Sequence, residues 1–314
     1  MDTLQLIKIN DNQLLASLNA NQPNFSKSIK IDVKFKSLQD PINQIKHDIL
    51  NGYIKSGGNK QTLEFLKEQS YTLFNILNLF DFQNYFSKLK TDKKPNHIQI
   101  ILDSDTNSIP FEILHDGKDF LSDYIIFSRM LIDFKNKFGD SSLIESNNKF
   151  TLIGNPSESE DISHHVDNEL NEISSLIAPF FQLKGPYKKR YVDKIELIRL
   201  LGTSSLFHFS GHYHEEDGMG GWKLFKDIFT SNDIKKTSRV PDFIFSNSCG
   251  NSSILFINFI NSFLNKGSKV IISSLGSLPS KKASEFSQIF YKYFTMGTHN
   301  VGKAFFLARE EMIK

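Results

Sequence analysis

Short apolar segments alternate with segments of helical periodicity through the second half of the chain. A strand followed by a helix and another strand usually forms a parallel pair, because the helix carries the chain back to the same edge of the sheet. The pattern predicts an α/β fold with a mostly parallel sheet and helices on both faces. The strand candidates are residues 150–156, 206–212, 243–249 and 269–276, and the helical patterns lie near residues 162–183, 192–201, 252–266, 280–296 and 299–313.

The first half of the chain has a less regular pattern. Its apolar alternations are typical of strands, and one long segment has helical spacing. We expect strands at 3–9, 28–36 and 97–105, a helix over 60–90, and a short element, a turn at 115–118 and a further strand within 109–130.

A domain boundary is expected at residues 138–149, the most polar and least periodic stretch of the chain. A chain of 314 residues fits one or two domains. We therefore predict an N-terminal subdomain over 1–145 and a second domain over 146–314. The N-terminal part is expected either to recognise a partner or to complete the fold.

Composition excludes several classes of partner. A formal net charge of +2 is too small to indicate a nucleic-acid or membrane surface. No apolar run approaches the roughly 18 residues of a membrane span, and the start of the chain shows no secretion signal. The single cysteine cannot form an intrachain disulfide. These features favour a cytoplasmic, reducing setting.

Two of the expected strands end in reactive side chains. One ends in Gly211-His212 and the other in Ser248-Cys249-Gly250. The carboxyl ends of parallel strands lie at the same edge of a sheet, where α/β proteins place their sites. A thiol attacks a carbonyl as thiolate, and a neighbouring imidazole can take its proton and later return one to the leaving group. The sequence therefore predicts Cys249 as a nucleophile and His212 as its acid–base partner.

Other interpretations of these residues remain open from the residues alone. A lone cysteine is more often a packed, inert thiol, and a lone histidine is more often structural. His208, His212 and His214 share one face of an extended strand and precede an acidic run. No second cluster stands at ligand spacing, so no metal site is expected. Glu112 is expected to make a structural hydrogen bond or ion pair.

Several motifs together resemble the CHAT domains of the caspase/separase clan of cysteine peptidases. The motifs are FHFSGH (207–212), WKLFKDIFTSNDI (222–234) and FIFSNSCG (243–250), followed by a helix ending in glycine at 259–267 and by closing helices at 286–297 and 301–310. Upstream, residues 103–114 and the strand end at 154–156 also look like features of these domains. The resemblance covers about residues 97–314.

This resemblance implies a caspase-like three-layer sandwich and endopeptidase activity through a Cys–His dyad and a thioacyl intermediate, with no metal or organic cofactor. His212 matches the acid–base histidine and Cys249 the nucleophile. The backbone N–H groups of Tyr213, Cys249 and Gly250 match the oxyanion hole. Family members commonly have glycine where this chain has Tyr213, and a positive φ at that position would strain a tyrosine.

The resemblance also bears on specificity. Relatives that cut after arginine or lysine often carry an aspartate in a tryptophan-x-valine-x-aspartate stretch, and the matching residues 276–280 contain no acid. A basic side chain would lack a buried partner there. We expect a pocket formed by Gly276, Ser280 and Ser248 that accepts a small or apolar residue before the cut. Lys281 and Lys282 make an acidic residue the second expectation.

The resemblance further implies a protein substrate encoded nearby, such as a pore-forming effector activated in bacterial defence or cell death, and an activating partner. The glycine-rich segment 213–222 is expected to be either an ordinary hairpin or a segment that must order before the dyad is competent. Two further hypotheses are kept. One is a catalytically silent interaction module, and the other is a flavodoxin-like domain that binds a phosphorylated small molecule.

Overall fold

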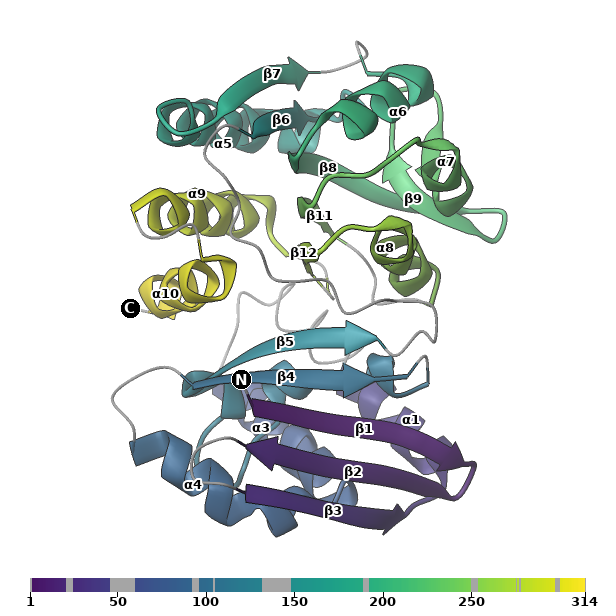
Figure 1. The fold of residues 1–314 in the computed structure, drawn as a ribbon, viewed down its shortest axis with the longest axis vertical. Helices are drawn as coiled ribbons and strands as arrows, with labels where there is room; N and C mark the ends of the chain where they lie inside the picture. Colours follow the sequence, from purple (N-terminus) through teal and green to yellow (C-terminus); the bar gives the residue numbers. More distant parts are fainter. Residues whose placement is uncertain are drawn as a thin grey trace. The chain divides into compact units, whose positions relative to one another are not determined.

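The chain forms two compact units, Met1–Lys137 and Phe138–Lys314 (Figure 1). Each unit has its own sheet and is described by itself. Most of the boundary expected from the sequence lies outside the described residues. This computed structural model describes residues 2–20, 25–45, 60–91, 96–103, 105–131, 148–188, 192–249, 254–274, 276, 278–296 and 300–313.

The first unit contains a five-stranded sheet of mixed direction. A two-residue turn joins β1 to β2, so these strands are antiparallel, whereas β1, β4 and β5 run parallel. The expectation of a mostly parallel sheet is therefore met only in part in this unit. The strand order is β3-β2-β1-β4-β5, with β1 (Asp2–Asn10), β2 (Gln13–Ala20), β3 (Phe25–Asp32), β4 (Asn96–Leu102) and β5 (Ile125–Leu131).

Helices of the first unit pack against its sheet, and both contribute residues to its core. The helix expected over 60–90 is interrupted at Asn78, which has a left-handed backbone with φ of 49°. Among the core residues are Leu6, Leu73, Phe82 and Ile100. The helices are α1 (Phe35–Gln44), α3 (Lys60–Ile76) and α4 (Gln83–Thr91), with short 3-10 turns at Leu79–Phe82, Thr106–Ser108, Phe111–Ile113 and Leu121–Asp123.

Glu112 has the structural role expected from the sequence. Its carboxylate accepts two hydrogen bonds from the Arg129 guanidinium on β5, at 2.7 and 2.5 Å. Arg129 also donates to the carbonyl oxygens of Asn107 and Ile109. This paired arrangement ties the segment after β4 to the edge strand of the first sheet.

The second unit contains the parallel sheet expected from the sequence, with an antiparallel extension. Strands β7, β6, β8, β11 and β12 form a parallel array in that order, and β9 and β10 continue from the far half of β8 as antiparallel hairpins. The strands are β6 (Lys149–Gly154), β7 (Gln182–Lys188), β8 (Leu206–Glu216), β9 (Met219–Lys223), β10 (Ile228–Thr230), β11 (Phe243–Cys249) and β12 (Val270–Ser274).

Helices cover both faces of this sheet, as expected for a three-layer sandwich (Figure 1). Along β8, Leu206 packs into the cluster of α5, α9 and α10, whereas Phe207 and Phe209 pack into the cluster of α6, α7 and α8. We call these two sides the α5/α9 face and the α8 face. The helices are α5 (Glu160–Ile177), α6 (Lys194–Thr203), α7 (Ser231–Lys236), α8 (Ile254–Lys266), α9 (Ser280–Met296) and α10 (Val301–Ile313).

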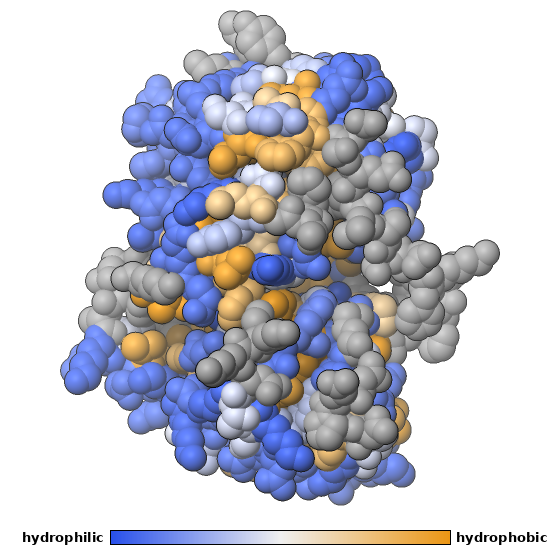
Figure 2. All heavy atoms as spheres, turned by 60° about the vertical axis from the view of Figure 1, so that its left-hand side comes forward, coloured by the Kyte–Doolittle hydropathy of each residue, from blue (hydrophilic) through white to orange (hydrophobic). Residues whose placement is uncertain are grey.

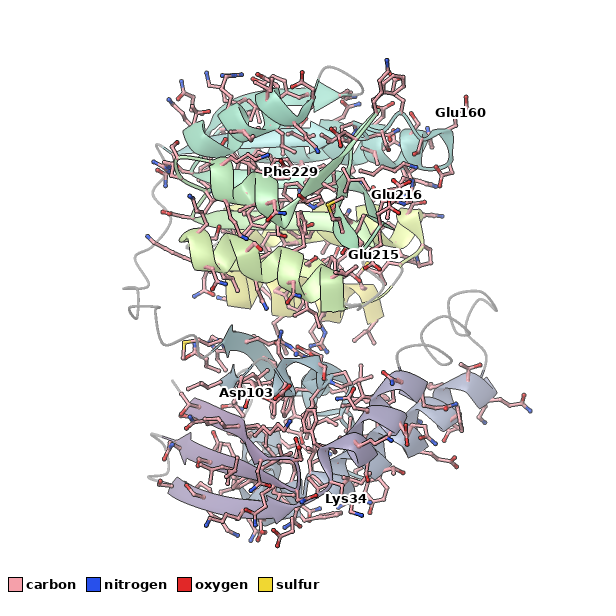
Figure 3. All side chains as sticks on the ribbon, turned by 90° about the vertical axis from the view of Figure 1, so that its right-hand side faces the viewer. Lys34, Asp103, Glu160, Glu215, Glu216 and Phe229 are labelled. Atoms are coloured by element: carbon pink, nitrogen blue, oxygen red, sulfur yellow. The ribbon has the colours of Figure 1, made fainter. Side chains whose placement is uncertain are left out.

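The glycine-rich segment 213–222 is an ordered hairpin. Asp217 and Gly218 form its turn with φ of 50° and 74°, the type I′ geometry that matches the twist of paired strands. Gly221 is required there because an added Cβ would lie 1.9 Å from the carbonyl oxygen of Phe229. Figure 3 shows Glu215 and Glu216 on this hairpin. The segment has the hairpin form of the first expectation, and control of the dyad by its ordering stays a prediction.

The surface is mixed in character. Figure 2 shows hydrophobic side chains reaching the surface in patches bordered by hydrophilic ones. Exposed apolar residues of the second unit include Phe180, Leu278, Met296 and Ile313. Within the described residues, each helix is too short or too polar to cross a bilayer.

Candidate active site

His212 and Cys249 stand opposite each other at the carboxyl edge of the parallel array. The register of β8 and β11 is unbroken from Leu206↔Phe243 to His212↔Cys249. Neighbouring strands lie about 4.8 Å apart, so these two backbone positions are one ladder step apart. The side chain of Cys249 lies outside the described residues, and the dyad itself stays a prediction.

The His212 imidazole contacts a carboxylate that the sequence analysis did not single out. Its Nε2 atom lies 3.4 Å from Oδ1 of Asp161, in the first turn of α5. The His212 side chain is 32% exposed and the Asp161 side chain 69%. With Nε2 directed at a carboxylate, Nδ1 is left for a second partner. Acidic residues are common in the first turn of a helix, where they interact favourably with the helix dipole. The sequence alone therefore offers no reason to expect Asp161 beside His212.

The turn between β6 and α5 fixes the position of Asp161. The backbone N–H of Asn155 donates to the carbonyl oxygen of Ser210 on β8. The side-chain oxygen of Asn155 accepts from the backbone N–H of Ser159, the residue before α5. An added Cβ on Gly154 would lie 2.2 Å from Leu170, so α5 packs closely on the end of β6. The start of α5, with Glu160 labelled in Figure 3, is thereby attached to β8 close to His212.

A fully buried carboxylate lies on the α5/α9 face, behind the proposed dyad. Glu169 of α5 is 1% exposed and accepts hydrogen bonds from Ser210 on β8, Asn247 on β11 and Ser287 on α9, at 2.7, 2.7 and 2.6 Å. Nε2 of His208 lies 3.1 Å from the same carboxylate without the alignment of a hydrogen bond. We call these five residues the Glu169 cluster.

Burial alone would raise the pKa of Glu169, but the His208 imidazole and the hydroxyl groups of Ser287 and Ser210 outweigh it and hold the pKa below its ordinary value. Nδ1 of His208 lies 3.1 Å from the hydroxyl group of Tyr291, whose pKa is raised by burial and by the Glu169 charge. His208 is completely buried, which confirms its interpretation as a core histidine.

Tyr213 is accommodated on the α8 face without the strain expected from the sequence. It lies in β8, paired with Trp222, and its φ is not positive. Its ring packs edge-to-face on Phe256, with centroids 4.9 Å apart. Space for the ring comes from Gly220, since a Cβ there would lie 1.9 Å from the tyrosine hydroxyl oxygen. The glycine of the neighbouring strand thus compensates for the tyrosine.

The other residues expected at the site have different surroundings. Gly250 lies outside the described residues. Gly276 exchanges hydrogen bonds with the Ser274 hydroxyl group, and Ser280 begins α9. Ser248 is 1% exposed and shares a hydrogen bond of 2.8 Å with Ser246, so its side chain belongs to the interior.

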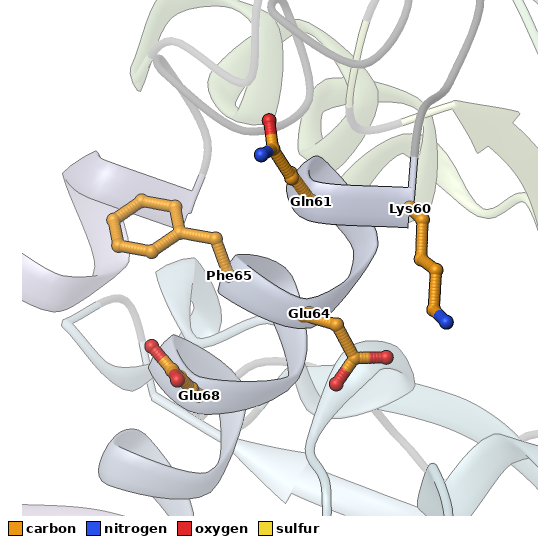
Figure 4. A pocket seen from close by; sticks show the side chains of 5 residues that line it. All are labelled: Lys60, Gln61, Glu64, Phe65 and Glu68. Atoms are coloured by element: carbon orange, nitrogen blue, oxygen red, sulfur yellow. The ribbon is translucent and has the colours of Figure 1, made fainter.

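Two hollows of the surface are lined by residues other than those expected at the site. One of about 370 Å³ lies along α3, where Figure 4 shows Lys60, Gln61, Glu64, Phe65 and Glu68 projecting from successive turns. Another, of about 210 Å³, lies between α9 and α10 and is lined by Leu278, Phe286 and Met312 among others. In the part of the chain that the structure describes, no three histidine, cysteine or acidic side chains gather as metal ligands.

Comparison with known proteins finds similarity in structure only. No family model matches the chain, and no curated protein matches it in sequence. Among solved structures, the chain is similar to the separase–securin complex of Saccharomyces cerevisiae, with a TM-score of 0.62 and 12% sequence identity. The match covers 98% of this chain and 28% of that one, so the chain spans less than a third of its structural relative. At this identity the match shows a shared fold.

Proposed function

We propose that the protein is a cysteine endopeptidase in which Cys249 is the nucleophile and His212 the general base and acid. The observation that carries the proposal is the pairing of His212 with Cys249 at the carboxyl edge of the sheet. Residues in register on adjacent parallel strands share a face, and strand alternation gives positions 208, 210 and 212 the α5/α9 face. The same alternation predicts that face for position 249.

The proposed reaction uses a covalent intermediate. His212 takes the proton of the Cys249 thiol, and the thiolate attacks the carbonyl carbon of the substrate peptide bond. The imidazolium then gives its proton to the leaving amine, and a thioester joins substrate and enzyme. A water molecule, deprotonated by the same imidazole, hydrolyses the thioester and restores the thiol. Asp161 orients the imidazole ring through Nε2, so that Nδ1 serves the thiol.

The oxyanion formed in both steps requires backbone donors at the strand ends. We assign this role to the N–H groups of Tyr213, Cys249 and Gly250. For specificity we retain a pocket near Gly276 and Ser280. Because residues 276–280 offer no acidic partner for a basic side chain, we propose cleavage after a small or apolar residue.

A single activating cut in a partner protein is the biological role that the resemblance favours. The substrate class is a protein, such as a pore-forming effector encoded nearby and activated in bacterial defence or cell death. An activating partner and a cytoplasmic setting belong to the same proposal.

Cleavage assays test the activity directly. A peptide library and the proteins encoded beside this chain are incubated with wild type, Cys249→Ala and His212→Ala, and the products are measured by intact mass. The proposal expects cuts with wild type that both substitutions abolish. Cuts that persist in Cys249→Ala contradict it. A wild-type thiol that neither cuts nor reacts quickly with an electrophile favours the silent interaction module.

A further inference from the structure

The Glu169 cluster connects the two strands that carry the proposed dyad. Ser210 and Asn247 are register partners on β8 and β11, and each donates to a different oxygen of the same carboxylate. His212 and Cys249 are the next register pair on the same face. The buried Glu169 carboxylate therefore accepts a hydrogen bond from each strand, two residues before His212 on β8 and Cys249 on β11.

Burying the Glu169 cluster costs more desolvation free energy than burying apolar side chains in its place would. A carboxylate buried away from water is tolerated only when both of its oxygens accept hydrogen bonds or contact a cation. Apolar side chains of similar volume would fill the same space without needing such partners. Ser287 of α9 donates a third hydrogen bond to this carboxylate, and the His208 imidazole of β8 lies 3.1 Å from it. A buried charge that specifies which residues lie side by side is the best-attested use of such groups.

We infer that Glu169 is a positioning residue, which holds β8 and β11 in the register that places His212 beside Cys249. The inference rests on the proposed function. Glu169 acts through Ser210 and Asn247 and does not touch the reacting atoms. It differs from Asp161, which acts on the imidazole ring itself.

Alkylation of the single cysteine by iodoacetamide tests this role, because each intact mass shift reports Cys249 alone. Glu169→Gln keeps the shape of the side chain but removes an acceptor. Ser287→Ala is the matched control, since it removes the bond from α9 to the same carboxylate and leaves both strand bonds in place. Melting temperatures of both variants measure the structural cost.

The inference expects Glu169→Gln to slow alkylation at neutral pH by about tenfold or more, the order expected for a misplaced catalytic group. Ser287→Ala should react within about twofold of wild type, even where both variants melt at lower temperature. Equal slowing in the two variants, or none in Glu169→Gln, overturns the inference. Ser210→Ala removes the bond to β8 only and should also slow alkylation. If Glu169→Gln does not fold, a Ser210→Ala protein that reacts like wild type overturns the inference.

Hydrogen exchange separates this inference from the proposed function. In Glu169→Gln, backbone amides of β8 and β11 should exchange faster than in Ser287→Ala. If wild-type Cys249 reacts no faster than a small free thiol, the proposed function fails. The exchange measurement then still tests whether Glu169 holds β8 and β11 in register. Unchanged exchange in β8 and β11 of Glu169→Gln overturns the positioning role.

Discussion

The His212 imidazole contacts the Asp161 carboxylate, and this contact joins the start of α5 to the end of the parallel part of β8. Because the carboxylate is largely exposed, water and salt weaken the pair, and its contribution is about 1 kcal/mol at most. Its value to the site lies in orientation, since a ring held through Nε2 presents Nδ1 to the thiol. The contact is therefore expected to matter more for reactivity than for stability.

Asp161→Asn is predicted to slow alkylation of Cys249 by about fivefold, the rate equivalent of about 1 kcal/mol. The melting temperature should change little. Glu160→Gln removes the neighbouring first-turn carboxylate and serves as the control for the loss of helix-dipole charge. Equal slowing in Glu160→Gln would assign the effect to general electrostatics and contradict an orienting contact.

Glu169 gives the fold a dependence on pH whose direction follows from its surroundings. Its pKa in the folded protein lies below the ordinary value of 4.5. The carboxylate therefore contributes its full stabilisation above that ordinary value and loses it as pH falls through the lower, folded pKa. Among the described residues, the titratable groups that act on it are His208 and Tyr291.

Thermal melting of wild type and Glu169→Gln between pH 7 and pH 3 checks this dependence. Removing one partner of a buried charged cluster should destabilise the protein by about 3 kcal/mol at pH 7. The difference between the two proteins should shrink as pH falls, because the wild-type carboxyl becomes protonated. A difference that stays constant down to pH 3 would show that the charge of Glu169 contributes nothing.

At the residue scale, the sequence predicts which reactive residues lie near the ends of strands. It does not predict contacts between side chains of different elements. The position of Cys249 at the end of β11 follows from its apolar strand. The strand expected to end at His212 continues to Glu216, so His212 marks only the end of the parallel part of β8. The burial of His208 follows from alternation. Asp161 looks like an ordinary first-turn acid. Glu169 offered a readable signal, because it lies within a stripe of apolar positions on α5, but its partners come from three other elements.

At the scale of elements, the hairpin of β8 and β9 shows what local pattern alone leaves open. Glycines at 218, 220 and 221 are compatible with a mobile loop, and the structure uses them for a turn and for two close approaches. Tyr213 and Gly220 form one such pair across the hairpin. The sequence contained both residues, but only their register in the sheet reveals that one makes room for the other.

Gly221→Ala is predicted to destabilise the second unit by about 3 kcal/mol, because the added methyl group meets backbone atoms of Phe229 that no rotamer change can move. Gly202→Ala is a matched control in α6, where a Cβ would approach only the Ser238 hydroxyl oxygen at 3.1 Å. Alanine favours helix, so this control should be near neutral. Chemical denaturation measures both, and equal stability of the two variants would show that the hairpin tolerates the methyl group.

Elements were best predicted where periodicity is long and strong. The strands β6, β11 and β12 and the helices α6, α8, α9 and α10 follow the expected segments closely, whereas β8 continues past its expected end to Glu216 and α5 ends early, at Ile177. The sequence missed β2 and β7, whose burial patterns are irregular, the helix α1, and the short β9, β10 and α7. Mixed direction in the first sheet was missed with β2, since the turn that joins it to β1 sets the antiparallel pairing.

At the scale of the whole molecule, each of the two units has its own sheet and its own apolar core. The apolar cluster of the first unit runs from Leu4 to Ile125, and both clusters of the second unit lie between residues 150 and 308. The strand pairings of the described residues stay within one unit. Each unit therefore buries its own core.

A chain of residues 138–314 alone is predicted to fold, with a cooperative thermal transition and with Cys249 alkylated at a rate close to that of the full protein. Calorimetry and intact mass measure the two properties. A shortened chain without a transition would show that the first unit is required to complete the fold of the second.

The most direct test of the central claim is the rate of Cys249 alkylation by iodoacetamide at neutral pH, in wild type and in His212→Ala. A thiol that shares its proton with an imidazole is largely thiolate near neutral pH and reacts faster than a free thiol. The account predicts rapid labelling of wild type and a decrease of at least about tenfold in His212→Ala. Slow labelling of wild type, or equal rates in the two proteins, would contradict it.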